Sequence, residues 1–484
     1  MRRTRTRVAL AVATAATTLG ALAAPSTTAR AAAADDRTWV AAWTANATAI
    51  SDTSPACPGT SGVSNRTIRN IVFTSAGGDR VRVRVTNAFG TQPLRLAAAT
   101  IAVAQSSTSA AVVPGTTRAL TFSGSPSTTI PTGADLRSDP VALPVSALQT
   151  LAVSLYFAEP TGPTTVHRFP YQRSYSAAGD VTANESAGAF TQNLSCWLFV
   201  DAVDAEAAGP VDGAVIALGD SITDGGNTTS NTNRRWTNEL ARRVVAQGAP
   251  ALSVVNAGLV GNQVTLDRVP VTFGMSALHR LDRDVLSHSG VRLLIVFEGI
   301  NDIGTREADA ARVIAGYREI IARAHANGVK VIGATLTPSG GATRQFPTYA
   351  SPETEADWRA VNTWIRTSGA FDTVFDFAAA LASPQNDWIM APAYDSGDGL
   401  HPGDAGMRAI ADSVDLGVLR ELLDPATWLD ELHATLDGLE DAGSVPPHVA
   451  ASLRDRLDRA ERLAVGGHEK APMGYLQQFA ARAR

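Results

Sequence analysis

The chain of 484 residues lacks long hydrophobic runs beyond its N-terminus, and it lacks an excess of positive charge. No later segment has the 18 or more apolar residues that a membrane-spanning helix needs. Basic residues number 41 and acidic residues 46, so the formal net charge is −5. An acidic protein is a poor candidate for binding nucleic acid or anionic membrane surfaces. We therefore expect no membrane span and no nucleic-acid partner.

Cysteine is equally scarce, because Cys57 and Cys196 are the only residues of this type. No group of cysteine and histidine has the spacing of a zinc site, so we expect no metal centre. Two cysteines in an oxidising compartment most simply form a disulfide, with two separate buried thiols as the alternative. A Cys57–Cys196 bond would close a loop of roughly 140 residues, which stabilises by ~4–5 kcal/mol in the chain-entropy model.

The N-terminal residues indicate that the protein enters an oxidising compartment. Residues 2, 3, 5 and 7 are arginines, an apolar stretch follows from Val8 to about Ala24, and small residues follow it, with A-x-A-like cleavage options near Ala29–Ala34. This pattern predicts a secretory signal peptide over residues 1–34 and a secreted, extracellular protein. A membrane anchor is disfavoured because the apolar stretch is short and rich in Ala and Thr. Cleavage would remove five arginines and no acidic residue, taking the net charge from −5 to −10.

Residues 35–205 have the pattern of an all-β domain. The stretch "RVRVRVTN" (80–87) alternates charged and apolar residues, as in a strand with one buried face. The stretch "RNIVFTS" (69–75) precedes it across a Gly-Gly turn, which predicts a hairpin. Clusters of Pro, Gly, Ser and Thr separate further short apolar runs. We therefore predict a β-sandwich or jelly roll.

After a linker near residues 205–213, the pattern over residues 212–422 changes to apolar runs that alternate with amphipathic segments. Apolar strands separated by helices are typical of a parallel sheet covered on both faces, which is an α/β fold. The runs lie at 214–218, 252–258, 292–299, 329–336 and 373–378. The last segment, 424–484, has leucines at helical spacing, and it predicts a small helical domain of three helices.

The stretch "IALGDSITDG" (216–225) ends the first parallel strand in a serine, Ser221. This serine either caps the following helix or is presented to a substrate. Motifs after later strands favour the second interpretation, because ligands of such sheets bind beyond the carboxyl ends of the strands. These motifs are "NAGLVGN" (256–262), "EGIND" (298–302) and "DGLHPGDAG" (398–406).

The residue types in these motifs fit nucleophilic catalysis. A serine hydroxyl needs a base, and a neutral imidazole such as that of His401 suits this task near neutral pH. A carboxylate three residues away, Asp398, can hold the imidazole in one tautomer. The side chain of Asn301 can donate an N–H to a developing oxyanion.

Together and in this order, the four motifs resemble the SGNH/GDSL hydrolase superfamily over about residues 212–420. The resemblance implies a flavodoxin-like three-layer α/β/α fold and a serine esterase that needs no cofactor. It implies that Ser221, Asp398 and His401 form the catalytic triad. One departure is Ile222, where the family's first motif has leucine.

The same resemblance implies an oxyanion hole. Its donors would be the Ser221 and Gly261 backbone amides and the Asn301 side chain, with Gly258 the less favoured glycine. We expect the neighbouring Asp220, Asp224 and Asp302 to be structural hydrogen-bond acceptors. Two aromatic residues, Trp236 and Trp388, either line the substrate cleft or pack in the core.

The substrate class rests on the flanking segments. A β-domain preceding the esterase would suit a polysaccharide deacetylase. The tail resembles a FIMAH-type helical domain of extracellular carbohydrate-active proteins, through its leucine spacing and its "EKAPMGYLQQF" ending. We therefore expect the ester substrate to be an acetylated polysaccharide or a carbohydrate carrying other short acyl groups. The alternatives are a lipase or esterase acting on short-chain lipid esters, and a non-catalytic carbohydrate-binding protein.

Overall fold

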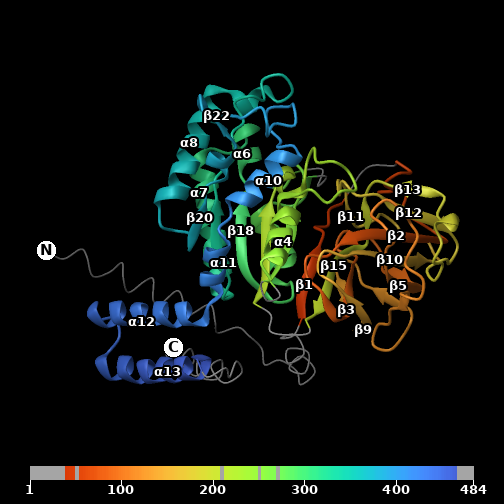
Figure 1. The fold of residues 1–484 in the computed structure, drawn as a ribbon, viewed down its shortest axis with the longest axis horizontal. Coiled ribbons are helices and arrows are strands. Elements are labelled where there is room, and N and C mark those ends of the chain that lie inside the picture. Colours follow the sequence, from red (N-terminus) through yellow and green to blue (C-terminus); the bar gives the residue numbers. More distant parts are fainter. Residues whose placement is uncertain (1–38, 50–53, 208–211, 249–251, 269–272, 466–484) are drawn as a thin grey trace. The chain divides into compact units, whose positions relative to one another are not determined.

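The computed structural model describes residues 39–49, 54–207, 212–248, 252–268 and 273–465 (Figure 1). The predicted signal peptide, residues 1–34, lies outside the described residues, as does the "EKAPMGYLQQF" segment. Residues Thr38–Asp415 form one compact unit that contains a β-sandwich and an α/β domain. The helices from Leu416 onward belong to a second unit.

The N-terminal part is an antiparallel β-sandwich, as the alternating pattern predicts. One sheet consists of β1 (Trp39–Thr44), β15 (Val200–Glu206), β3 (Gly78–Thr86) and β8 (Asp135–Arg137), with β9 (Val141–Val145) also paired to β3. The other consists of β13 (Gln192–Leu194), β12 (Ser174–Ala178), β2 (Arg66–Phe73), β10 (Thr150–Phe157), β5 (Ala98–Val103) and β6 (Arg118–Ala119). Two short pairs complete it, β4 (Leu94–Leu96) with β7 (Thr128–Ile130) and β11 (Val166–His167) with β14 (Trp197–Leu198). A single 3-10 turn, η2, spans Ala187–Ala189.

The apolar face of β3 forms part of the sandwich core. Val81, Val83 and Val85 are at most 1% exposed and share one apolar cluster with Ile68 and Leu155 of the opposite sheet. The predicted hairpin between β2 and β3 is wrong, because these strands belong to different sheets. The Gly-Gly turn at 77–78 instead carries the chain from one sheet to the other.

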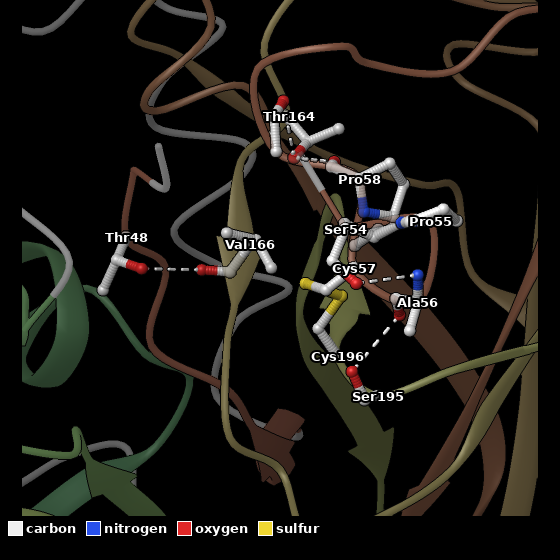
Figure 2. The surroundings of a disulfide bond; sticks show 12 residues. Thr48, Ser54, Pro55, Ala56, Cys57, Pro58, Thr164, Val166, Ser195 and Cys196 are labelled. Carbon is white, nitrogen blue, oxygen red and sulfur yellow. Dashed lines mark hydrogen bonds between the residues drawn. A yellow bond between two sulfur atoms is a disulfide. The ribbon is translucent and has the colours of Figure 1, made fainter. Parts of the chain in front are cut away.

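A disulfide between Cys57 and Cys196 holds the loop before β2 against the start of β14 (Figure 2). The two Cα atoms are 5.6 Å apart, and both cysteines are buried. Beside the bond, the backbone N–H of Ser195 donates to the carbonyl of Ala56 at 2.7 Å. The Ser195 hydroxyl donates to the same carbonyl at 3.3 Å (Figure 2). The predicted disulfide is present, and the alternative of two separate thiols is wrong.

The α/β domain contains a parallel sheet in the order β17-β16-β18-β19-β20, which is the 2-1-3-4-5 order of flavodoxin-like folds. Its strands are β16 (Gly213–Gly219), β17 (Leu252–Gly258), β18 (Val291–Phe297), β19 (Lys330–Ala334) and β20 (Thr373–Phe375). The last predicted strand is shorter than the run 373–378, because Asp376 caps a new helix by accepting a hydrogen bond from the backbone N–H of Ala379.

Helices cover both faces of this sheet, with α4 and α10 on one side and α7 and α8 on the other (Figure 1). Every residue of β16 is buried, which explains its continuous apolar sequence. The helices are α3 (Ser221–Asp224), α4 (Trp236–Ala246), α5 (Ala277–Leu281), the π-helical η4 (Asp282–Leu286), α6 (Ile300–Gly304), α7 (Ala310–Ala326), η5 (Pro347–Ala350), α8 (Pro352–Thr367), α9 (Phe377–Leu381) and α10 (Asp404–Ser413). A short hairpin of β21 (Ala382–Ser383) and β22 (Asn386–Met390) precedes α10.

The sandwich packs directly against the α/β domain, with β1 beside the edge strand β17 (Figure 1). Two residues on the charged face of β3, Arg82 and Arg84, are buried in this junction. Arg82 donates to Asp204 at 2.9 Å and to the Ser289 hydroxyl at 2.9 Å. Arg84 pairs with Asp201 at 2.9 Å. The alternating strand "RVRVRV" therefore has a buried apolar face and an ionic face that is buried at Arg82 and Arg84 but partly exposed at Arg80.

The second unit contains α11 (Leu416–Leu423), α12 (Pro425–Asp441) and α13 (Pro447–Val465). The helices α12 and α13 pack through the predicted leucine stripes. Leu429 and Leu436 of the first share an apolar cluster with Leu453 and Leu457 of the second.

Candidate active site

Ser221 is the first residue of α3, two positions beyond the end of β16. The helix is capped by Asp220, whose side chain accepts a 2.8 Å hydrogen bond from the backbone N–H of Ile222. The alternative in which Ser221 caps the helix is therefore wrong. The Ser221 hydroxyl lies 2.8 Å from Nε2 of His401.

Asp398 and His401 lie on the loop between β22 and α10. The Nδ1 atom of His401 is 2.7 Å from Oδ2 of Asp398. A neutral imidazole that donates from Nδ1 presents a lone pair on Nε2, and Nε2 is the nitrogen that faces Ser221. The structure thus brings the three side chains together in a continuous line of hydrogen bonds.

The Asp398 carboxylate is also held from other sides. Its Oδ1 atom accepts from the backbone N–H groups of Leu400 (2.9 Å) and His401 (2.8 Å), and its Oδ2 atom accepts from the Asn227 side chain at 2.9 Å. Burial alone would raise the pKa of Asp398. The hydrogen bonds and charge of His401, together with the Leu400 N–H, outweigh burial and lower this pKa to about 2. Asp398 is therefore ionised at neutral pH.

The three predicted oxyanion donors follow neighbouring strand ends. Gly219 of β16 pairs with Gly258 of β17 on one side and with Phe297 of β18 on the other. Beyond these positions the chain enters the segments that carry Ser221, Gly261 and Asn301. All three donors therefore lie at the carboxyl edge of the sheet.

Gly261 has a backbone conformation that favours glycine. Its φ is +73°, and a Cβ atom there would lie 2.5 Å from the Phe273 ring. Gly258 is needed for a different reason, because a Cβ atom at that position would lie 2.3 Å from the backbone nitrogen of Asp224 in α3. The two glycines therefore allow the loop that follows β17 to turn close to α3.

The Asn301 carboxamide is held in one orientation by two neighbours. Its Nδ2 atom donates to the carbonyl of Asn262 at 2.9 Å. Its Oδ1 atom accepts from the Tyr349 hydroxyl at 2.7 Å. Nothing in the sequence around Tyr349, which lies in the 3-10 helix η5 before α8, pointed to this contact.

Arg280 is a second residue that sequence analysis missed. Its side chain is 0% exposed, and its guanidinium lies beneath the strand ends. It donates to the carbonyls of Gly219 (3.0 Å) and Ala257 (2.8 Å) and to the Asn262 side chain (2.8 Å). Arg280 thereby links the segments before Ser221 and Gly261. The sequence "ALHRLDRD" offers no signal that separates Arg280 from an ordinary helix-surface arginine.

The carboxylates near the nucleophile are buried and structural. Burial raises the pKa of Asp220 to about 7, against the hydrogen bond from the Ile222 N–H and the charge of His401. Burial likewise raises the pKa of Asp302 to about 6. Asp302 accepts hydrogen bonds from the backbone of Val264 (2.8 Å) and Thr265 (3.2 Å), as predicted for a structural acceptor.

Trp236 and Trp388 pack in the interior. Trp236 is 0% exposed and contacts Phe297 and Phe377, while Trp388 packs on Trp358. The suggestion that these tryptophans line a substrate cleft is therefore not supported, and the core-packing alternative holds.

Within the described part of the chain, no helix is both long and apolar enough to cross a bilayer. The same residues contain no group of three or more His, Cys, Asp or Glu side chains placed to hold a metal ion.

Residues 217–409 match the model of the GDSL-like Lipase/Acylhydrolase family. Residues 217–409 therefore form a GDSL-like lipase/acylhydrolase domain, and the protein is a carboxylic ester hydrolase.

Solved structures with a similar fold cover less than half of this chain. An aryl esterase from M. smegmatis is 17% identical, with a TM-score of 0.35, over 43% of this chain and 99% of that one. A carbohydrate acetylesterase from Sinorhizobium meliloti is 17% identical, with a TM-score of 0.34, over 43% and 99%. A GDSL-like lipase from Bacteroides thetaiotaomicron is 17% identical, with a TM-score of 0.32, over 45% and 92%. Similarity this low transfers neither a substrate nor the roles of residues, and no curated protein matches the chain.

Proposed function

We propose that the protein hydrolyses esters through an acyl-enzyme formed on Ser221, with His401 as general base and Asp398 as its orienting partner. The observation that carries this proposal is the 2.8 Å contact between the Ser221 hydroxyl and Nε2 of His401. Nε2 takes the hydroxyl proton as Oγ attacks the ester carbonyl, and the imidazolium then protonates the leaving alcohol. Water repeats the sequence on the acyl-enzyme and releases the acid.

The developing oxyanion would accept hydrogen bonds from the backbone N–H groups of Ser221 and Gly261 and from the Asn301 side chain. The contact of Asn301 with Asn262 uses one hydrogen of the amide group, and the other is available to the substrate oxygen. Donors fixed before the reaction stabilise the transition state without further reorganisation, and each contributes roughly 2.7–4 kcal/mol.

We propose further that the alcohol part of the substrate is polar, as in an acetylated polysaccharide. The side chains bordering the triad support this. Asn227, which contacts Asp398, is exposed and bonds the exposed Ser396 hydroxyl at 2.9 Å. The ring centre of Phe346 is 6.0 Å from that of His401, and the two residues before it in the chain, Arg344 and Gln345, are exposed. A polar rim suits a hydrated sugar better than a long acyl chain.

The sharpest test is a comparison of substrates on one enzyme preparation. We expect acetate release from acetylated xylan or acetylated pectin at a higher kcat/KM than hydrolysis of tributyrin, with Ser221→Ala as the blank. Faster hydrolysis of tributyrin would favour the alternative of an esterase acting on short-chain lipid esters. Lack of hydrolysis of every ester would favour a carbohydrate-binding protein.

We also propose that residues 1–34 direct export of the protein. The Cys57–Cys196 bond supports this, because disulfides persist mainly in oxidising compartments. Expression of the full chain in a secreting host, followed by N-terminal sequencing of the protein in the medium, tests the proposal. A product that stays in the cell with its N-terminus intact would contradict it.

A further inference from the structure

A buried contact joins the β-sandwich to the helix that carries Ser221. His167, the last residue of β11, points its Nε2 atom at Oδ1 of Asp224, the last residue of α3, at 2.9 Å. Both side chains are only 3% exposed. The proposed catalytic steps use neither residue, so the contact needs a separate explanation.

The same two side chains lead to the loop that carries the proposed oxyanion donor Gly261. The other oxygen of Asp224 accepts a hydrogen bond from the backbone N–H of Val260 at 3.3 Å, one residue before Gly261. From the sandwich, the Asn46 side chain donates to the carbonyl of Gly258 at 3.1 Å. Loop 258–261 is therefore held at both ends, once directly by Asn46 and once by His167 through Asp224.

The hydrogen bonds also assign donors on the imidazole. The Nδ1 atom of His167 is 2.9 Å from the carbonyl oxygen of Asn46, which can only accept, so Nδ1 carries a hydrogen. A second hydrogen must then lie between Nε2 and the Asp224 carboxyl group, bound either to the ring nitrogen or to the carboxyl oxygen. The two ring nitrogens thus make two separable contacts, one within the sandwich and one across the junction.

A further buried side chain fastens the same junction. Arg235 donates to the backbone carbonyl of Asp224 at 2.8 Å and also to the carbonyl of Pro170 in the sandwich. The Trp197 ring of β14 lies 5.2 Å from the His167 ring and 5.6 Å from the Arg235 guanidinium. Packing around the pair leaves His167 little freedom to move away from Asp224.

We propose that His167 and Asn46 are positioning residues for the oxyanion loop, so that the β-sandwich is a working part of the catalytic site. The inference rests on the proposed function, because it assumes that the Gly261 N–H stabilises the transition state. Loss of either contact lets the loop relax, which lowers kcat while substrate binding in the ground state changes little.

Two substitutions at one position separate the contacts of the imidazole. The side-chain amide of glutamine reaches the place of Nε2 and keeps a donor for Asp224, whereas that of asparagine reaches only the place of Nδ1. We expect His167→Asn to lower kcat for p-nitrophenyl acetate by about tenfold to a hundredfold. This loss is smaller than the loss of kcat that follows complete removal of an oxyanion donor. His167→Gln should stay within about threefold of wild type, and KM should stay within about threefold in both variants.

A matched control is His325→Ala. This variant removes another histidine–aspartate contact, in which His325 and Asp372 are 2.7 Å apart. That contact lies near the start of β19, at the end of the sheet opposite to Ser221. This variant should keep wild-type kcat. The rate of Ser221 labelling by a fluorophosphonate should fall in His167→Asn in parallel with kcat, because phosphonylation needs the same oxyanion donors.

The outcomes distinguish the inference from the proposed function. The inference is overturned if His167→Asn keeps wild-type kcat, or if the Asn and Gln variants lose equal activity. The proposed function still stands in either case, provided that Ser221→Ala is inactive. An active Ser221→Ala would overturn both. If thermal unfolding shows that the His167 variants do not fold, Asn46→Ala provides the test: a tenfold or larger loss of kcat at unchanged KM supports the inference, and wild-type kcat overturns it.

Discussion

The hydroxyl of Tyr349 donates a 2.7 Å hydrogen bond to Oδ1 of Asn301. Burial and the neighbouring carboxylates Asp220 and Glu307 raise the pKa of Tyr349 above its ordinary value, so the hydroxyl stays protonated and can donate at any working pH. The contact fixes the orientation of the carboxamide, because Oδ1 accepts from Tyr349 while Nδ2 donates to the carbonyl of Asn262.

This relationship predicts graded losses of activity. Asn301→Ala should lower kcat by about 10²–10³, because it removes a donor to the oxyanion. Tyr349→Phe should cause a smaller loss of kcat at nearly constant KM, because the donor remains but its orientation is less restricted. Steady-state kinetics on p-nitrophenyl acetate check both. A loss below tenfold in Asn301→Ala would show that this side chain is not an oxyanion donor.

Ser221→Ala should abolish turnover and leave stability almost unchanged. The substitution removes one small hydroxyl and its hydrogen bond to His401, so the free energy of unfolding should change by about 1 kcal/mol or less. Hydrolysis of p-nitrophenyl acetate and thermal unfolding, measured on the same sample, test the prediction. Normal turnover in a folded Ser221→Ala variant would remove this serine from the mechanism.

The depressed pKa of Asp398 predicts a pH-dependent stability. The folded-state value of about 2 lies below the ordinary value of 3.8, so the contribution of this carboxylate is complete above about pH 4. That contribution is lost as the pH falls from about 4 to about 2. Asp398→Asn should therefore destabilise the protein at pH 7, by on the order of 2 kcal/mol, and have little effect near pH 2. Urea unfolding of both proteins across this range measures the difference; a gap that is the same at all pH values would contradict the assignment.

Arg280→Met should destabilise the fold strongly. The substitution leaves the buried carboxyl groups of Glu298 and Asp284 without their common partner, and such losses cost about 3–5 kcal/mol. As a control, Arg359→Met removes an exposed arginine from Glu355 and Asp387, and it should cost about 1 kcal/mol or less. Urea unfolding compares the two variants. Equal effects would mean that Arg280 contributes no more than a surface ion pair.

The strand pattern and the predicted catalytic contacts were accessible from sequence because each depends on short stretches. The apolar runs marked the parallel strands, and residues that follow such strands must meet at one edge of the sheet. The pairing of Ser221 with Asp398 and His401 came from the resemblance of the four motifs to those of SGNH/GDSL hydrolases, and it holds although 180 positions separate the serine from the histidine.

Pairings between distant segments were not accessible in this way. The alternation in "RVRVRV" marks two faces of a strand, but it does not say whether the charged face meets water or another layer. In the fold, Arg82 meets Asp204 and Ser289 in a buried junction. The hairpin predicted between β2 and β3 failed for a related reason, because a two-glycine turn also permits a crossing between sheets.

By itself, the sequence determined the alternation of strands and helices in the α/β domain and the residues at the carboxyl edge of its sheet, because these follow from periodicity and motifs that are local in the chain. Only the tertiary structure decided that Arg280 lies beneath the strand ends, that Tyr349 orients Asn301, and that His167 reaches Asp224. Each of these contacts joins side chains whose neighbours in sequence carry no trace of the partner, since hydrogen-bond geometry exists only once the layers have packed.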